Sequence, residues 1–440
     1  MLRELSIQIR ARHDGLQMLV VGCLLFIGLG VLQEITNPLA MTDFQETWNG
    51  ARCLVLNLDP YQPDQMWSVY MQQAPHLPAD PAVAHTLHLI VSLSTNLPTT
   101  LLLVAPLALL PWKLAMVLWM AILSVCFVLA CCCIWKVNAA IAPRFSGALI
   151  FLLAVNSGLL LATGNMAALS VGLAAIAVCC FIRDRFVPLG IFLLAVSLFI
   201  KPHDAGPIWL YFLLAGGVQR KRALQTLVLT VVMAAPAALW LYHVAPHWPQ
   251  EYHANILTAM SPGGRDYPGP NTAGGRGMGM IVSLQAALSL LRDDPGFYNP
   301  IAYLICGALI LVWCVKTWRV GYSSRLAWFA LASISALALL PVYHRTYDAR
   351  LLLLTIPAAA MLWRQRGWLG WTALWLTIAA FVLTGDLFWI VLFQATHYSG
   401  LSVTLAMIPA PLILLALGVF YLWVYLRSGT TPPDLQPDEG

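Results

Sequence analysis

Four well-separated places in this 440-residue chain put ionisable or amide side chains next to long apolar runs. Asp43 follows the first run, Asn165 lies between two runs, and Lys201 ends another. The fourth place is the hexapeptide 343–348, Tyr-His-Arg-Thr-Tyr-Asp, just before a further apolar run. A charge beside lipid is costly unless it is paired or used, so these groups are candidate functional residues. A base and cations at a lipid–water boundary suit an anionic headgroup, of which a lipid phosphate is the simplest.

Each residue also has a structural explanation when it is taken alone. Asp43 fits the N-cap of a helix over residues 44–56 whose apolar face would rest on the membrane. Lys201 fits a side chain that extends to the headgroup layer. His344 fits a hydrogen-bonded turn residue, and Asn165, which follows a glycine, fits an ordinary turn. Only their shared location favours a functional site.

The elements that position these residues must be membrane helices. The chain is 60% hydrophobic and 10% charged, and its mean hydropathy is +0.76, whereas about a quarter of the residues in soluble proteins are charged. The net charge of +5 does not indicate nucleic-acid binding, because the basic residues are sorted to one side of the membrane. No phosphate-binding loop or dinucleotide fingerprint occurs, and the ten cysteines show no metal-ligand or disulfide spacing.

Thirteen apolar segments are candidate membrane spans. Basic residues precede the first and follow the last, so both termini are expected in the cytoplasm, which requires an even number of crossings. The segment 97–110 is expected to be re-entrant or interfacial, because it is short and contains or adjoins three prolines. The thirteen segments are 16–35, 97–110, 113–134, 146–162, 165–182, 187–200, 203–217, 224–244, 299–317, 325–341, 349–363, 367–386 and 402–426.

The sequence thus predicts an all-α, polytopic membrane bundle with about twelve transmembrane helices. The basic connections then fall inside, and two long loops, about 36–96 and 245–298, fall on the acidic outer side. Residues 1–427 are expected to form one integral membrane domain, and 428–440 a disordered cytoplasmic tail. In the second loop, the glycine- and proline-rich stretch 261–279 is expected to be either a mobile lid over the site or a passive linker.

Short motifs in this chain resemble glycosyltransferase family 87, whose members are polytopic enzymes of the GT-C class. The stretch from Asp43-Phe-Gln-Glu-Thr-Trp to Asp59-Pro-Tyr61 resembles the opening signature of that family. Four further matches follow in the family's order, and the resemblance covers about residues 41–360. They are the proline-bearing segment from Leu97, Gly164-Asn165 in place of the usual Gly-Gln, Lys201-Pro202, and His344 with Tyr347-Asp348.

The resemblance implies a GT-C-like fold and an inverting glycosyltransferase that uses a polyprenyl-phosphate sugar, mannose being the characterised case. The acceptor would be a hydroxyl of a lipid- or glycan-linked molecule on the outer face. Because such a donor already carries its leaving group, no nucleotide site, no obligatory metal and no other cofactor is expected. The resemblance also implies a bacterial inner-membrane protein. It is expected to be a monomer, with polyprenyl and membrane lipids as partners and no nucleic acid.

The resemblance further assigns roles to the candidate residues. Asp43 is expected to be the base that takes the acceptor proton, with His344 as the alternative; otherwise His344 would hold the acceptor or the donor phosphate. Lys201 and Arg345 would neutralise that phosphate, and Asp348 would orient His344 or Arg345. Asp348 could instead only form an ion pair with a neighbouring arginine. The remaining expected donor-site residues are Asn165, Tyr61 and Tyr347.

Three other interpretations stay open. A secondary transporter would place its binding residues on broken helices near the bilayer midplane and would often show internal repeats, none of which is visible here. The chain could also be a GT-C enzyme of another type, such as an oligosaccharide ligase or an arabinosyl-type transferase. The third interpretation is a scaffold whose site has decayed.

Overall fold

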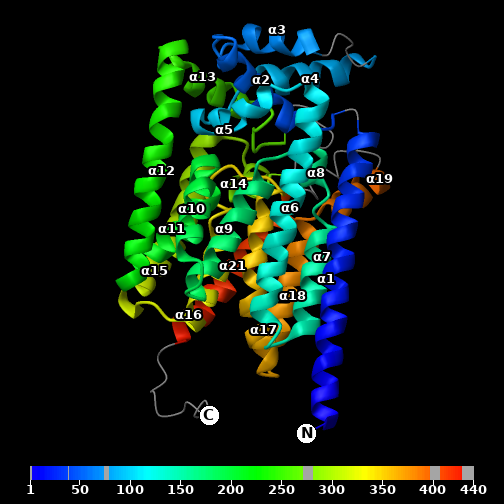
Figure 1. Ribbon diagram of the computed structural model, residues 1–440, viewed down its shortest axis with the longest axis vertical. Coiled ribbons are helices and arrows are strands. Elements are labelled where there is room, and N and C mark those ends of the chain that lie inside the picture. The colour runs from blue at the N-terminus through cyan, green and yellow to red at the C-terminus, as the bar shows by residue number, and fades with distance from the viewer. Residues whose placement is uncertain (1, 38, 74–78, 271–280, 397–406, 429–440) are drawn as a thin grey trace.

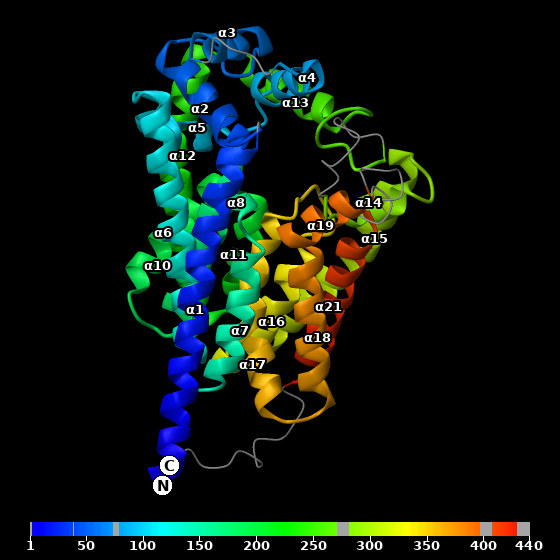
Figure 2. The ribbon, with the colours of Figure 1, turned by 90° about the vertical axis from the view of Figure 1, so that its right-hand side faces the viewer.

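In the computed structural model, the described residues are 2–37, 39–73, 79–270, 281–396 and 407–428. They fold into an elongated bundle of helices, with a layer of shorter helices across its upper end (Figures 1 and 2). Within these ranges, the only strand-like pairing is an isolated bridge between Ile281 and Arg345. The predicted all-α class is confirmed, whereas residues 429–440 of the predicted tail lie outside the described part of the chain.

Most bundle helices run along the long axis of the molecule (Figure 1). The helices of the bundle are α1 (Leu2–Thr36), α6 (Trp112–Asn138), α7 (Pro143–Val155), α8 (Leu159–Ala162), α9 (Ala167–Ile182), α10 (Val187–Ile200), α11 (Pro202–Leu214), α12 (Gly217–Val244), α15 (Pro295–Val320), α16 (Ser324–Leu337), the 3-10 helix η1 (Asp348–Thr355), α17 (Ile356–Arg364), α18 (Trp368–Leu383) and α21 (Pro409–Arg427). The start of α1 and the end of α21 both lie at the lower end (Figures 1 and 2).

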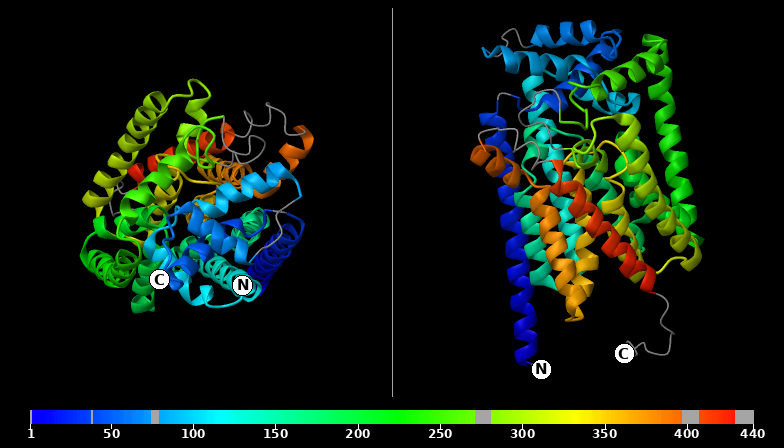
Figure 3. Two further views of the ribbon diagram at one scale, coloured as in Figure 1. Left: turned by 90° about the horizontal axis from the view of Figure 1, so that it is seen from above. Right: turned by 180° about the vertical axis from the view of Figure 1, so that it is seen from behind.

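The upper layer is called the cap layer below. It consists of α2 (Thr42–Val55), α3 (Pro63–Gln73), α4 (Pro81–Ser92), α5 (Pro98–Ala108) and α13 (Trp248–Met260). Seen from above, its helices lie across the ends of the bundle helices (Figure 3). Two further short helices, α14 (Leu284–Ser289) and α19 (Asp386–Thr396), lie at the upper ends of neighbouring bundle helices (Figure 2).

Six helices in the described part of the chain are long and apolar enough to cross a membrane. They are Gln8–Thr36, Trp112–Asn138, Pro143–Ala162, Gly217–Val244, Pro295–Val320 and Pro409–Arg427. A seventh candidate is the pair Trp368–Leu383 and Asp386–Leu392, which is bent by 59°. The chain therefore has the helices of an integral membrane protein.

The predicted number of twelve spans is not confirmed, because several apolar segments form helices that are too short. For example, α10 has 14 residues, which corresponds to about 21 Å of helix, against about 30 Å of hydrocarbon. Helices such as α9 and α16 are buried along most of their length, whereas only 11% of the apolar window of α12 is buried. A run that is apolar because protein covers it looks, in the sequence, like a run that lipid covers.

The segment 97–110 forms α5 and does not run along the bundle. It is an 11-residue helix with Pro106 inside, and it belongs to the cap layer (Figure 1). The hydroxyl of Thr100 donates to the carbonyl of Ile200 at 3.0 Å, so α5 lies over the upper end of α10. The expected re-entrant or interfacial position of this segment stays a prediction.

The predicted membrane-surface helix over residues 44–56 is α2, but its expected exposure is wrong. Nearly every residue of α2 is buried, including most of the polar ones, while Asp43 and Arg52 are half-buried. Phe44 stacks on Trp119 of α6 with ring centres 5.0 Å apart, and Trp48 Nε1 donates to the carbonyl of Leu107 at 3.0 Å. The helix therefore fills the junction between the bundle and the cap layer instead of resting on lipid.

Candidate functional site

The first turn of α2 is anchored on the loop between α8 and α9. The backbone N–H of Asp43 donates to the carbonyl of Thr163 at 3.1 Å. Gly164 permits this approach, because its φ is +68° and an added Cβ would lie 2.6 Å from the Cβ of Phe44. The turn that carries Asn165 therefore lies directly beside Asp43.

The carboxylate of Asp43 is held by the side-chain amide of Asn165. Oδ2 of the half-buried Asp43 accepts a hydrogen bond from Nδ2 of Asn165 at 2.8 Å. Oδ1 of Asn165 accepts from the backbone N–H of Ala167, at the start of α9, also at 2.8 Å. The amide is thus fixed through both of its polar atoms. The N-cap alternative for Asp43 is wrong, because Met41 occupies that position of α2.

Lys201 lies at the break between α10 and α11, where Pro202 begins the second helix. Its Nζ donates to Oδ1 of Asp348 at 2.5 Å and lies 5.2 Å from the centre of the Tyr347 ring. The side chain is only 16% exposed, so it points into the protein and does not extend to a headgroup layer. Burial alone would lower the pKa of Lys201, but the carboxylates of Asp348 and Asp204 raise it overall.

The side chain of Asp348 closes the turn formed by residues 345–348. Its Oδ2 accepts from the backbone N–H of Arg345 at 2.9 Å, while Oδ1 binds Lys201. Arg350 instead donates to the carbonyl of Asn156 at 2.6 Å and to other groups of the bundle. The ion pair of Asp348 is therefore with a lysine from another helix break, which no local pattern in the sequence indicates.

These separate segments meet at the junction of the bundle and the cap layer. Asp43 is close enough to Lys201, Arg345 and Tyr347 to interact electrostatically with each of them. Because Asn165 binds Asp43 and Asp348 binds Lys201, six of the eight expected site residues belong to one neighbourhood. A carboxylate and a buried ammonium in such proximity can take a proton and hold an anion, respectively.

His344, the seventh, lies beside two residues that were not expected to matter. Its Nε2 is 3.6 Å from Oδ1 of Asp204, and its ring is 5.1 Å from that of His203, centre to centre. Burial, followed by the neighbouring His203, lowers the pKa of His344. The ligand atoms of these three residues all lie within 4.8 Å of one another, which is a spacing that could hold a metal ion. His203 and Asp204 directly follow Lys201-Pro202 in the sequence, but only Lys201 of this stretch was predicted to be a site residue.

The guanidinium of Arg345 is engaged with the second long loop. Its Nη2 donates to Oδ1 of Asp266 at 2.9 Å and to the carbonyl of Arg265 at 2.8 Å, and its Nε donates to the hydroxyl of Tyr343. Burial would raise the pKa of Asp266, but Arg265 and Arg345 lower it overall. A phosphate-binding role for Arg345 would therefore require it to exchange or share these partners.

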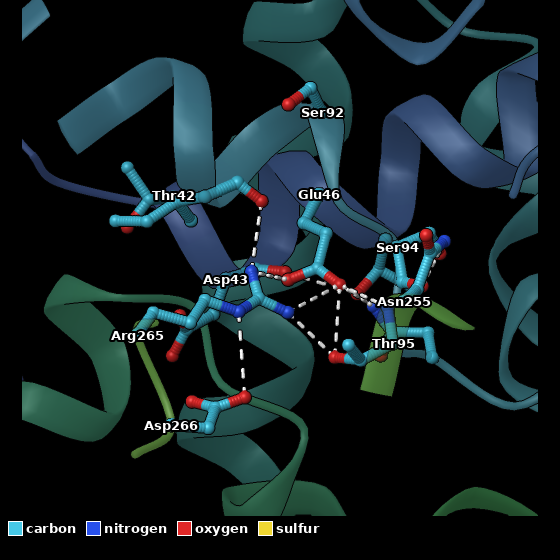
Figure 4. A network of polar contacts seen from close by, with 12 residues as sticks. Thr42, Asp43, Glu46, Ser92, Ser94, Thr95, Asn255, Arg265 and Asp266 are labelled. Atoms are coloured by element: carbon cyan, nitrogen blue, oxygen red, sulfur yellow. Dashed lines mark hydrogen bonds and ion pairs between the residues drawn. The ribbon is translucent and has the colours of Figure 1, made fainter. Parts of the chain in front are cut away.

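Arg265 and Glu46 form a buried ion pair that the sequence analysis missed (Figure 4). Arg265 donates to both carboxylate oxygens of Glu46, at 2.8 and 3.1 Å, and to Oγ1 of Thr95 at 2.6 Å. Burial raises the pKa of Glu46, although Arg265 opposes this shift. The described part of the predicted lid, 261–270, is thus anchored on the cap layer, and residues 271–279 lie outside the described part of the chain.

Tyr61, the eighth expected residue, lies within the cap layer. Its hydroxyl donates to the carbonyl of Asn96 at 2.9 Å, and its ring packs against Tyr252 and Trp248. Its described hydrogen bonds and ring contacts all join parts of the two long loops. These contacts within the protein account for the burial of Tyr61, so its burial does not require a bound donor lipid.

Comparison with known proteins found no matching family model, no matching curated protein and no matching solved structure.

Proposed function

We propose that this protein is a membrane glycosyltransferase that transfers a hexose or pentose, for example mannose, from a polyprenyl-phosphate donor to an acceptor hydroxyl, with inversion. One observation carries the proposal. The Asp43 carboxylate, oriented by Asn165, lies near the buried Lys201–Asp348 pair, at the end of an apolar bundle. A general base beside a fixed cation at a lipid boundary is what transfer from a lipid-linked phosphate needs.

Asp43 is the base in this mechanism. Oδ2 is occupied by the amide of Asn165, so the proton of the acceptor hydroxyl goes to Oδ1. The acceptor oxygen forms its bond to the anomeric carbon from the face opposite the phosphate. The bond between that carbon and the phosphate oxygen breaks, and its electron pair leaves on the polyprenyl phosphate. His344 is the alternative base.

Lys201 stabilises the departing phosphate. An ammonium group has three N–H donors, and the side-chain bond to Asp348 uses one of them. The other two can bind phosphate oxygens without breaking the buried ion pair. Asp348 then serves to position Lys201, whereas its expected role was to orient His344 or Arg345.

We propose further that the cap layer faces the outside of a bacterial inner membrane and that both termini face the cytoplasm. Two observations support this orientation. The start of α1 and the end of α21 lie at the end opposite the cap layer (Figures 1 and 2). Three arginines lie in the first part of α1, and Arg427 ends α21. A topology reporter fused after Lys113, at the start of α6, should report the outer side; a cytoplasmic signal would refute the orientation.

A secondary transporter is the alternative function, and the bent pair α18–α19 is the feature that favours it, because transporters bind substrates at broken helices. However, the break lies beside α14, at the upper ends of α18 and α21, and not near the middle of these two helices (Figure 2). We therefore prefer the transferase.

The test is the turnover of a radiolabelled polyprenyl-phosphate sugar by membranes that contain the protein. Label should move to a lipid- or glycan-linked product, in excess over membranes without the protein. Accumulation of unreacted label inside sealed vesicles, with no product, would favour the transporter instead.

A further inference from the structure

The second polar cluster at this end of the bundle consists of His203, Asp204 and His344. The first two lie in the first turn of α11, and His344 lies in the loop before η1. Nε2 of His203 is 3.8 Å, and Nε2 of His344 is 3.6 Å, from the same oxygen, Oδ1 of Asp204. The carboxylate oxygen therefore lies between two imidazole nitrogens.

The tautomer of His344 is fixed by its other ring nitrogen. Nδ1 lies 3.1 Å from the carbonyl of Val342, and a carbonyl can only accept, so Nδ1 carries the hydrogen. In the neutral ring, Nε2 then presents a lone pair to Asp204. A histidine whose Nδ1–H donates to a backbone carbonyl while its Nε2 faces another ligand group has the arrangement of a metal-bound histidine.

Within the described part of the chain, these atoms of Asp204 and His344 have no hydrogen-bond partner. They are the two carboxylate oxygens of Asp204 and the Nε2 atom of His344. Each of the two residues is only 1% exposed. Two buried acceptors that face each other repel, and burying them without a hydrogen-bond partner is unfavourable. A positive species between them removes both costs.

The separation of the two atoms favours a metal ion over a proton. A shared proton would draw Nε2 of His344 and Oδ1 of Asp204 to an ordinary hydrogen bond of about 2.7–3.2 Å. Ligand atoms around tetrahedral zinc, with bonds of about 2.0–2.1 Å, lie about 3.3 Å apart. The observed nitrogen–oxygen distances of 3.6 and 3.8 Å need only a small contraction to reach that geometry, and the two histidine nitrogens, which lie within 4.8 Å of each other, must approach as well.

The surrounding charge also permits a cation. Lys201 Nζ lies 3.8 Å from the other oxygen of Asp204, Oδ2, but its charge is balanced by Asp348, to which it is bonded. Lys201 therefore does not supply Asp204 with a full counter-charge, and Oδ1 of Asp204 is turned toward the two histidines and away from the ammonium.

We propose that His203, Asp204 and His344 bind one divalent transition-metal ion, preferentially Zn²⁺. Two imidazoles and one carboxylate are a ligand set typical of zinc sites that keep a fourth position for water or substrate. His203 is 42% exposed, so the ion can enter from outside. This site departs from the expectation that no metal is needed, and it does not depend on the proposed transferase activity.

The experiment measures zinc on the purified full-length protein in detergent, without any donor lipid. The protein is stripped with a chelator, titrated with Zn²⁺, and compared with its His203→Gln and His344→Gln variants. His203→Gln is the decisive variant, because its exposed side chain can be replaced without disturbing the core. His253→Gln, at an exposed position of α13, is the matched control. Titration with Mg²⁺ tests whether the site prefers nitrogen-binding metals.

Wild type and His253→Gln should each bind one equivalent of Zn²⁺. Both ligand variants should bind it at least about tenfold more weakly, because even the loss of a group that only orients a metal ligand lowers metal affinity about 10–100-fold. Mg²⁺ should not compete. The ten cysteines could bind zinc as well, but that background is the same in all four proteins. Equal binding in wild type and His203→Gln, or no binding by wild type, would overturn the proposal whether or not the protein transfers sugar.

Discussion

Replacing Arg265 by alanine should release residues 261–270 from the cap layer. The guanidinium donates to both oxygens of Glu46, to Thr95 and to the carbonyl of Ile90. Glu46 would be left buried without its cation. Removing one partner of a buried pair costs about 3–5 kcal/mol, which corresponds to a roughly 10²–10³-fold or larger increase in local opening.

Hydrogen–deuterium exchange with mass spectrometry measures this opening directly, on peptides that cover residues 261–270 and 90–96. Arg292→Ala is the matched control, because the side chain of Arg292 is 67% exposed in its pair with Asp294 and such surface pairs contribute about 0–1 kcal/mol. The double variant Glu46→Gln/Arg265→Gln should exchange less than the sum of the two single effects predicts. Unchanged exchange in Arg265→Ala, or strict additivity in the double variant, would refute the reasoning.

Two further predictions concern residues expected to bind the donor. Lys201→Met should raise the donor KM by about 10–100-fold, the loss of a charge-assisted hydrogen bond, whereas Lys201→Arg should retain part of the affinity. Steady-state kinetics with varied donor check this, and an unchanged KM in Lys201→Met would exclude Lys201 from phosphate binding. Tyr61→Phe should lower the free energy of unfolding by about 0.5–1.5 kcal/mol through loss of the bond to Asn96, with no change in donor KM. An increased KM in that variant would restore the donor-binding role that the resemblance implied.

The helical class and the positions of the helices could be predicted from the sequence, because apolar runs and prolines are local signals. The shortness of the helix in segment 97–110 followed from the length and the prolines of that segment, which forms the 11-residue helix α5. The number of long spans could not be predicted, because hydropathy does not distinguish burial in protein from burial in lipid. α9 and α16 are buried largely by other helices.

The candidate site was predictable only as a set of segments. The sequence indicated that Asp43, Asn165, Lys201 and the 343–348 turn lie at one end of the spans. It could not indicate their partners, because the Asp43–Asn165 and Lys201–Asp348 bonds join positions 122 and 147 residues apart. Arg265 was missed because an arginine in a glycine-rich loop has no local pattern that predicts burial.

The role of Asp43 as the base is the central claim, and the rate of sugar transfer by Asp43→Asn tests it most directly. Purified wild-type protein, Asp43→Asn, His344→Gln and the control Asp64→Asn are compared with a radiolabelled polyprenyl-phosphate sugar, for both turnover and donor affinity. Asp64 is exposed in the first turn of α3, another cap-layer helix, so its substitution controls for a lost surface charge.

Asp43→Asn keeps the shape of the side chain but cannot accept the proton. Its turnover should fall by about 10²–10⁴-fold while donor affinity is kept, and Asp64→Asn should match wild type. Near-normal turnover in Asp43→Asn would contradict the account, and a loss of turnover confined to His344→Gln would transfer the role of base to His344.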